Sequence, residues 1–460
     1  MVNIGISPLL LHRKIAFKGT DTANSNVSSL INADRMTDTF VKLATQDTGS
    51  DPELAKTKTP STPAQMELAK DLAKQLKEMN LQDVNIDQYG IVTATLPNNT
   101  KNDPNQPVIG LLAHMDTSSD VPTGPVIPQI HKYQGGDICL KEGTVIPASD
   151  LNNHKGENII TSDGTTLLGA DDKAGITEIL EALRVFNEHP ELKHPKVRIA
   201  FTPDEETGTG TEKFDIKKFG ADVAYTVDGE APTDVETENF NSFNPEITIH
   251  GKTIHTGSAY GKMINSLLIA NELINALPPN ETPATTKDKE GFFHVAKIDG
   301  DDSQTRLSVY VRDFDYQNAK ERVEFLKETA KELEKKYPGC KININPNEKS
   351  HNMKEKLNEC PEAIEYAKEG IRRSGLTPQE KSIRGGTDGS KLTMENLPTP
   401  NLGAGGANFH SKNEFVSVQD MTKCTGNIIN ILSVWSEKSE ESTPGMLERR
   451  KKTKDLNLSV

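Results

Sequence analysis

The chain has 460 residues, more than one hydrophobic core usually organises, so we expect two domains. Its formal net charge of -14 disfavours nucleic acid and anionic membranes as partners, because binding to phosphate groups requires a basic surface. No segment approaches the roughly 18 consecutive apolar residues of a membrane-spanning helix, and no signal peptide stands out, which predicts a cytoplasmic protein.

The first part of the chain predicts a mainly parallel sheet. Residues 1–33 lack periodicity and are expected to form an N-terminal extension of uncertain order. Residues 34–238 then alternate predicted strands with helices, the order typical of a parallel α/β sheet. Polar side chains follow the strand ends or begin a helix, and these are His114, Asp116, Asp171, Glu205, Glu206 and Asp228. We expect them to meet, because ligands bind beyond the carboxyl ends of the strands in such sheets.

A different order of elements follows. Residues 239–351 predict strands and helices in the order β-α-β-β-α-β, which is the ferredoxin-like arrangement, as an inserted lid or dimerisation domain. Residues 352–436 return to the first domain and carry His410 in a glycine-rich stretch. Residues 437–460 are rich in charges and are expected to form a disordered tail. An insertion between two halves of a domain suits a lid.

The polar residues at the strand ends suggest a metal centre. Imidazoles and carboxylates without cysteine suit Zn²⁺, and also Co²⁺ or Mn²⁺, in an open catalytic site. Two histidines are few neutral donors for one tetrahedral zinc ion, but they suit two ions about 3.5–4 Å apart that share a carboxylate and a water. Taken singly, each piece is more often structural, since an acidic loop can be merely solvated and an aspartate at a helix start is commonly a cap.

Neighbouring carboxylates at Glu205 and Glu206 suggest a division of roles. On an extended backbone adjacent side chains point to opposite sides, so one glutamate can hold a cation while the other addresses a water. A pair of metal ions needs an unligated base nearby to take the proton of that water. Glu205 is placed to be this general base.

Six segments resemble the di-zinc metallopeptidase family that contains tripeptide aminopeptidases, carboxypeptidase G2, carnosinases and succinyl-diaminopimelate desuccinylase. They are residues 114–117, 168–175, 201–206, 225–229, 383–389 and the stretch around His410. The similarity runs from about residue 34 to about residue 436. It implies an α/β fold in which a mainly parallel-sheet di-zinc catalytic domain carries an inserted ferredoxin-like α+β lid domain.

The resemblance also implies roles for individual residues. It gives two ligand sets that share one aspartate: His114, Asp171 and Asp228 for one ion, and Asp171, Glu206 and His410 for the other. Asp116 would orient His114, and Glu205 would activate the bridging water and return its proton to the leaving amine. Family members typically have a cis peptide after the bridging aspartate, which predicts one between Asp171 and Asp172.

Residues of the lid complete the expected site. His255 matches the family histidine that stabilises the oxyanion, although Thr256 stands where the family has proline. In dimeric relatives this histidine can come from the partner's lid, so it could act in either subunit. Asn265, Arg312 and Arg384 are candidates for binding the substrate's C-terminal carboxylate. If they do not bind substrate, Asn265 would begin a helix and Arg312 would form a surface ion pair.

The function implied by the resemblance is a metal-dependent aminopeptidase. It would release the N-terminal residue from tripeptides when a metal-bridging water attacks the peptide carbonyl, with two divalent ions, most often Zn²⁺, as cofactors. Short peptides would be its substrates, and a homodimer through the lid is one arrangement that the family shows. The alternatives are a dipeptidase or N-acyl-amino-acid amidohydrolase of the same fold, or a non-catalytic relative that acts as a binding module.

Overall fold

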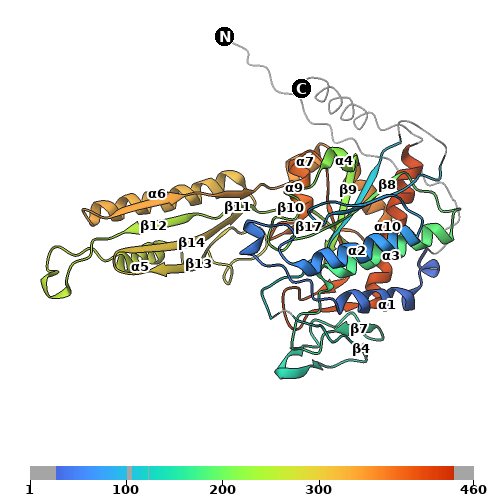
Figure 1. Ribbon diagram of the computed structural model, residues 1–460, viewed down its shortest axis with the longest axis horizontal. Helices are drawn as coiled ribbons and strands as arrows, with labels where there is room; N and C mark the ends of the chain where they lie inside the picture. The colour runs from blue at the N-terminus through green and yellow to red at the C-terminus, as the bar shows by residue number, and fades with distance from the viewer. Residues whose placement is uncertain (1–26, 101–105, 123, 440–460) are drawn as a thin grey trace, which may run out of the picture.

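Eight strands form the central sheet of the larger part of the molecule, in the order β1-β2-β8-β3-β9-β18-β10-β17 (Figure 1). The computed structural model describes residues 27–100, 106–122 and 124–439. Strands β8, β3, β9 and β18 are parallel neighbours, so their carboxyl ends share one edge. The strands are β1 Gln82–Ile86, β2 Val92–Leu96, β3 Ile109–His114, β8 Val197–Thr202, β9 Val223–Gly229, β10 Asp234–Asn239, β17 Gln379–Ile383 and β18 Asn401–Gly403.

Helices cover both faces of this sheet. In β3, Leu111 packs into the main core with α3 and α10, whereas its neighbour Leu112 packs on the opposite face into a smaller core with α4 and α9. Cover on both faces explains why β3 is an uninterrupted apolar run. The helices are α1 Ala33–Ala44, α2 Pro63–Glu78, α3 Ala170–Glu188, α4 Ile216–Phe219, α7 Lys354–Asn358, α8 Pro361–Arg373, α9 Asp388–Met394 and α10 Val418–Ser439.

The chain ends are partly described. Residues 27–30 form a 3₁₀ turn, and Ile31 is buried in the main core, so this end of the predicted extension packs on the catalytic part. Residues 1–26 and 440–460, which include most of the predicted C-terminal tail, lie outside the described residues. Within the described ranges, no helix combines the length and apolar character needed to span a bilayer.

Two small sheets, which the sequence did not reveal, lie beside the central one. Four strands pair in the order β19-β20-β7-β4, and β5 pairs with β6. The loop between β19 and β20 carries His410, so this sheet fixes both ends of a segment predicted to bear a ligand. The strands are β4 Gln129–Lys132, β5 Ile138–Cys139, β6 Val145–Ile146, β7 Asn158–Thr161, β19 Gly406–Ala407 and β20 Phe415–Ser417.

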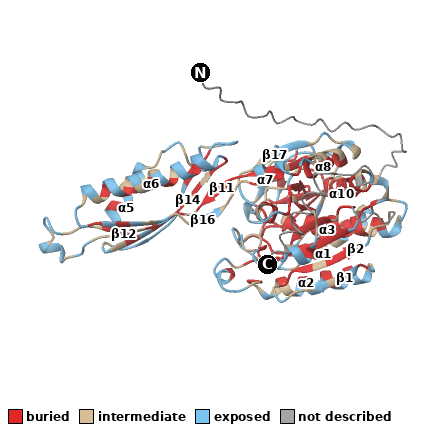
Figure 2. Ribbon diagram, turned by 90° about the horizontal axis from the view of Figure 1, so that it is seen from above, coloured by how far each residue is buried: buried red, intermediate tan, exposed pale blue. Residues whose placement is uncertain are grey.

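A second, antiparallel sheet forms a narrow extension that we call the lid (Figures 1 and 2). Its core strands pair in the order β15-β12-β14-β13, and the elements follow one another as β-α-β-β-α-β. The fold class predicted from the sequence is therefore confirmed. The lid elements are β11 Asn241–Phe243, β12 Glu246–His250, α5 Ser266–Ala276, β13 Phe292–Gly300, β14 Gln304–Asp313, α6 Tyr316–Lys336, β15 Lys341–Asn345 and β16 Glu348–Ser350.

Strand register gives the lid a base and a tip. At the base, β11 and β16 join the sheet, and Phe292 lies opposite Arg312. His250 and Gly300 lie opposite Gln304 and Thr305 at the other end, so the loops 251–265 and 301–303 form the lid tip, away from the central sheet (Figure 1). The predicted domain boundaries, residues 239 and 351, adjoin β10 and β16 and stay predictions.

Candidate metal centre

Asp171 lies between two pairs of candidate ligands. Its Oδ1 atom is 2.8 Å from Nε2 of His114, which ends β3, and that nitrogen is 3.4 Å from Oδ1 of Asp228 near the end of β9. On the other side, Nε2 of His410 is 3.2 Å from Asp171 Oδ2 and 2.9 Å from Glu206 Oε2. Each carboxylate oxygen of Asp171 thus lies beside one imidazole, and each of these imidazoles also lies beside one further carboxylate.

The first turn of α3 holds Asp171 and its neighbour in place. The peptide bond between Asp171 and Asp172 is cis, as predicted. The Asp172 carboxylate accepts hydrogen bonds from the backbone N–H groups of His114 and Gly175, both at 3.1 Å. A Cβ at Gly175 would lie 1.9 Å from the carbonyl oxygen of Val227 in β9. Only glycine allows this approach, which brings the helix of Asp171 against the strand of Asp228.

Asp116 positions more than the sequence indicated. Its Oδ1 atom lies 3.4 Å from Nδ1 of His114, which also contacts the Asp116 backbone oxygen at 3.1 Å. The same carboxylate accepts the backbone N–H groups of Glu205 at 2.9 Å and Glu206 at 3.2 Å. One buried aspartate therefore fixes both the histidine of the first ligand pair and the acidic loop that follows β8.

Glu205 lies next to the ligand pairs but belongs to neither. Its Oε1 atom accepts the backbone N–H of Asp388 at 3.1 Å, and the Asp388 carboxylate accepts the hydroxyl of Thr202 at 2.8 Å. Glu205 and Asp388 line one small cavity together with His114 and Asp228. Burial raises the pKa of Glu205 well above its ordinary value, because the charged form loses water contacts.

The chemistry of the donor atoms fits divalent cations. Burial, and then the negative charge of Asp171, raises the pKa of Glu206 to about 8. For Asp171 itself burial is outweighed by hydrogen bonds from His114 and His410, which lower its pKa. The Oε1 atom of Glu206 is buried and has no hydrogen-bond partner among the described residues. Imidazole and carboxylate donors that lie this close together suit Zn²⁺ or a related ion. The positive charge of the ion would offset the repulsion between the carboxylates.

Another group with metal-like spacing is an ion-pair network. His154, Glu157 and Asp420 bring their donor atoms within 4.8 Å of one another. Lys423 Nζ lies 2.6 Å from Asp420 Oδ1 and 3.7 Å from Glu157 Oε1, so a lysine already neutralises these carboxylates.

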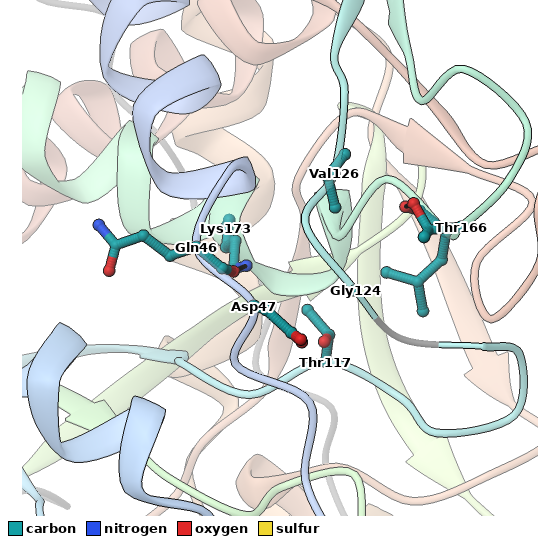
Figure 3. Close-up of a pocket in the computed structure, with 8 residues that line it drawn as sticks. Gln46, Asp47, Thr117, Gly124, Val126, Thr166 and Lys173 are labelled. Carbon is teal, nitrogen blue, oxygen red and sulfur yellow. Dashed lines mark hydrogen bonds between the residues drawn. The ribbon is translucent and has the colours of Figure 1, made fainter.

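The open pocket next to α3 contains none of the predicted metal ligands (Figure 3). Its empty space, with open solvent included, is about 220 Å³. The buried Lys173 reaches it and donates a hydrogen bond to the carbonyl oxygen of Gln46 at 2.5 Å. Burial lowers the pKa of Lys173 to about 8. The lining residues are Gln46, Asp47, Thr117, Gly124, Val126, Thr166, Leu167 and Lys173.

The predicted residues of the lid tip lie apart from these ligands. His255 is exposed in the loop 251–265, and its Nδ1 accepts the backbone N–H of Gly257 at 3.2 Å. Asn265 caps α5 by accepting the N–H groups of Leu267 and Leu268. At about 3.4 Å per residue, the ten residues of β14 put roughly 30 Å between the tip and the base of the lid.

The two predicted arginines lie at the lid base and have partners there. Arg312 donates to the backbone oxygen of Phe243 at 3.0 Å and to Asn244 Oδ1 at 2.9 Å, rather than forming a surface ion pair. Arg384, which precedes α9, donates to the backbone oxygens of Asp288 and Glu290 in the loop before β13. Its guanidinium carbon lies 5.1 and 5.6 Å from the ring centres of two phenylalanines, Phe240 and Phe292.

Two carboxylates of the site were not predicted from the sequence. Asp388 contacts the general-base candidate Glu205, and Glu414 accepts the backbone N–H of Asp171 at 3.0 Å. Neither ends a predicted strand. Their positions in the sequence could have pointed to them. Asp388 lies in the segment 383–389, which resembles the family, and Glu414 follows His410 by four residues.

Comparison with known proteins agrees with this geometry. The model of peptidase family M20/M25/M40 matches residues 161–433. Peptidase T of Geobacillus kaustophilus (strain HTA426) is 46% identical over 406 residues, which are 87% of this chain and 98% of the relative. Peptidase T of Listeria monocytogenes serotype 4a (strain HCC23) is 43% identical over 405 residues, with the same coverage of 87% and 98%.

A solved structure shares the fold. Aminopeptidase PepT from Bacillus cereus ATCC 10987 superposes with a TM-score of 0.68 at 23% identity, covering 88% of this chain and 99% of that one. The chain therefore belongs to peptidase family M20/M25/M40. Within that family, the curated relatives that it matches over nearly their whole length are peptidase T enzymes.

Proposed function

We propose that the chain is a metal-dependent aminopeptidase that releases the N-terminal residue from tripeptides. The observation that carries the proposal is the position of Asp171 between two histidines, each of which also contacts one further carboxylate. A bridging carboxylate between two ligand sets is what a two-metal hydrolytic site requires. The names of the relatives, peptidase T, support the tripeptide as substrate.

The proposed cofactors are two divalent ions, with Zn²⁺ preferred over Co²⁺ and Mn²⁺. His114, Asp171 and Asp228 would hold one ion, and Asp171, Glu206 and His410 would hold the other. When bound, the ions supply Lewis-acid chemistry: they polarise the peptide carbonyl and make the attacking water more acidic. A dinuclear metal-binding peptidase from Bacillus subtilis shares the fold, with a TM-score of 0.59, 16% identity, and coverage of 88% of this chain and 98% of that one.

Glu205 is the proposed general base. It would take the proton of the attacking water and later give it to the amine that leaves. Its backbone is held by Asp116 and its Oε1 atom by the N–H of Asp388, so the carboxylate has a fixed place beside the ligands. The raised pKa that burial gives Glu205 makes its carboxylate a stronger base than that of an exposed glutamate.

His255 is the proposed oxyanion donor, and we infer that it acts across a homodimer. It lies at the lid tip, roughly 30 Å beyond the lid base, which is too far for a contact with the ligands of its own chain in this conformation. The tip also exposes apolar side chains that a second subunit could cover, since Tyr260 is 100% and Leu268 64% exposed. Asn265 shares this tip and would reach the substrate carboxylate together with His255.

The roles proposed for Arg312 and Arg384 require a change of partners. Both could bind a substrate carboxylate through the planar guanidinium, but each already donates to backbone oxygens at the lid base. Movement of the lid during closure would have to release them. A cytoplasmic location and the lack of nucleic-acid or membrane partners are proposed from composition and charge alone.

The experiment is a substrate panel on zinc-loaded protein: a free tripeptide, its N-acetylated form, and the matching dipeptide and tetrapeptide, each beside the variant Glu205→Ala. We expect cleavage of the free tripeptide alone and its loss in the variant. Preference for the acetylated peptide would instead identify an amidohydrolase, and preference for the dipeptide a dipeptidase. Bound metal without turnover of any peptide would favour a binding module.

A further inference from the structure

We propose that Glu414 is a positioning residue that holds Asp171 in register with both ligand pairs and joins it to the loop that carries His410. The inference deepens the proposed function and rests on it, because it assumes that these residues hold metal ions. Glu414 would contact no metal and no substrate. It would act through the backbone of Asp171.

The contacts of Glu414 converge on one short segment. Its Oε1 atom accepts the backbone N–H of Asp171 at 3.0 Å, and its Oε2 atom accepts those of Leu168 at 2.8 Å and Gly169 at 2.7 Å. Glu414 is 1% exposed, so water does not compete for these bonds.

The N–H groups that Glu414 binds lie before the regular part of α3. The helix begins at Ala170, but the backbone of Asp171 and Asp172 is not helical, with ψ 103 and ψ 36. The regular helix that follows is capped by Asp172, which accepts the N–H of Gly175 at 3.1 Å. The irregular segment before it is held by Glu414, whose carboxylate lies 245 residues away along the chain from Gly169.

Glu414 also connects the two ligand pairs mechanically. It precedes Phe415, the first residue of β20, which pairs with Thr161 of β7. Its backbone is therefore fixed by a sheet, and it follows His410 in the same loop by only four residues. A shift of Asp171 relative to this loop would change the distance from one Asp171 oxygen to His410 and, at the same time, the distance from the other oxygen to His114. Residues that orient metal ligands in this way typically change metal affinity or activity about 10- to 100-fold when they are replaced.

The test measures Zn²⁺ binding to metal-free protein by competition with a chromophoric chelator, and then kcat and KM with a free tripeptide at saturating Zn²⁺. In Glu414→Gln one oxygen is replaced by an amide nitrogen, which cannot accept an N–H. We expect the affinity for at least one ion to fall about 10- to 100-fold, and kcat to stay reduced at saturating metal while KM changes little. Co²⁺ in place of Zn²⁺ should show the loss as a changed absorption spectrum.

Two matched variants separate positioning from general damage. Glu178→Gln changes another buried glutamate, on α3 itself, whose oxygens have no partner among the described residues. Glu142→Gln removes an exposed contact to Lys412 in the same loop as His410. Both should bind Zn²⁺ as the wild type does. Reduced affinity in Glu142→Gln equal to that of Glu414→Gln would overturn the proposal, because any loosening of the loop would then suffice.

The remaining outcomes are also decisive. If Glu414→Gln melts at a lower temperature but binds Zn²⁺ normally and keeps its kcat, Glu414 only stabilises the fold of the segment before α3. If that variant does not fold, Glu414→Asp keeps the charge with a shorter reach, and wild-type Zn²⁺ affinity in it would reject the proposal. A wild-type protein that binds neither Zn²⁺ nor Co²⁺ overturns the proposed function and this inference with it, whereas normal binding by the glutamine variant overturns this inference alone.

Discussion

The candidate metal centre and the lid differ in how firmly the fold holds their polar residues in place. At the carboxyl edge of the central sheet, Asp171 and Asp228 come from separate segments, and each has a carboxylate oxygen within 3.4 Å of Nε2 of His114, which belongs to a third segment. In the lid, His255 is exposed at the tip, and its hydrogen bond within the described part of the chain is with Gly257 of its own loop. The first set is assembled by one chain in one conformation. His255 can reach those ligands only if the lid moves or if a second subunit supplies it.

This difference indicates which residues of the proposed site have a geometry that is fixed when the chain folds. The ligands are held by backbone donors and buried carboxylates, among them Asp116 and Glu414, so their geometry comes with the core. His255 has no such support, and its place in the reaction depends on an arrangement of domains or subunits. Variants of the ligands should therefore change metal binding, whereas variants at the tip should lower turnover and leave metal binding unchanged.

The largest effect is expected for Glu205→Gln. Because it removes the general base but no metal ligand, kcat should fall about 10²- to 10⁴-fold while two ions stay bound. Turnover of a free tripeptide and metal content by mass spectrometry check this. The neighbouring change Glu206→Gln is the control, since it should lower the affinity for one ion. Loss of metal from Glu205→Gln would mean that this residue is a ligand and that the two glutamates have been assigned the wrong way round.

His255→Ala should come next, with kcat lower by about 10²- to 10³-fold, the usual effect of removing one oxyanion donor. Its metal content and thermal stability should match the wild type, because the side chain is exposed and far from the core. A rise in KM alone, with unchanged kcat, would instead show that His255 binds the substrate before the reaction.

Mixing subunits distinguishes action within a chain from action across a dimer. Neither His255→Ala nor Glu205→Gln should be active alone, but a mixed dimer would have one site that combines the intact Glu205 of one chain with the intact His255 of the other. Recovered activity on mixing supports the homodimer. No recovery, in a mixture shown to exchange subunits, would place His255 in its own chain and require a large closure of the lid.

The convergence of the candidate ligands at one edge of the sheet could be predicted for a physical reason. Strands in a parallel sheet end at a common edge, so polar residues at the ends of β3, β8 and β9 had to converge there whatever the details of packing. The order of elements likewise predicted the ferredoxin-like lid. Such inferences need only local pattern and a rule of topology.

The supporting residues could not be predicted in the same way. Glu414 acts on Asp171 across 243 residues of chain, through hydrogen bonds that exist only after the small sheet has formed. Arg384 was expected to bind substrate, but whether its guanidinium has free donors depends on how the lid base packs. Contacts of this kind between distant segments leave no periodicity in the sequence.

Arg384→Ala should show how firmly the lid base is held. The guanidinium donates to Asp288 and Glu290 and lies over two phenylalanine rings, so its loss should lower the free energy of unfolding by about 1 to 3 kcal/mol. Urea unfolding measures this, and faster proteolysis of the loop before β13 should accompany it. Arg384→Lys, which keeps the charge but not the planar fork, is the control. An increased KM for tripeptides at unchanged stability would favour carboxylate binding instead.

The smallest effect concerns Glu178, a buried acid of α3 that, unlike the carboxylates of the metal centre, has no hydrogen-bond partner among the described residues. Burial, and then the negative charge of Asp420, raises its pKa well above the ordinary value. The folded protein therefore holds this proton more tightly than the unfolded chain does, and its contribution to stability falls as the pH rises above about 4.3. In metal-free protein, Glu178→Gln should become more stable relative to the wild type as the pH rises from 5 to 8. Equal stability differences at both pH values, measured by urea unfolding, would show that Glu178 titrates normally and has contact with water or another polar group.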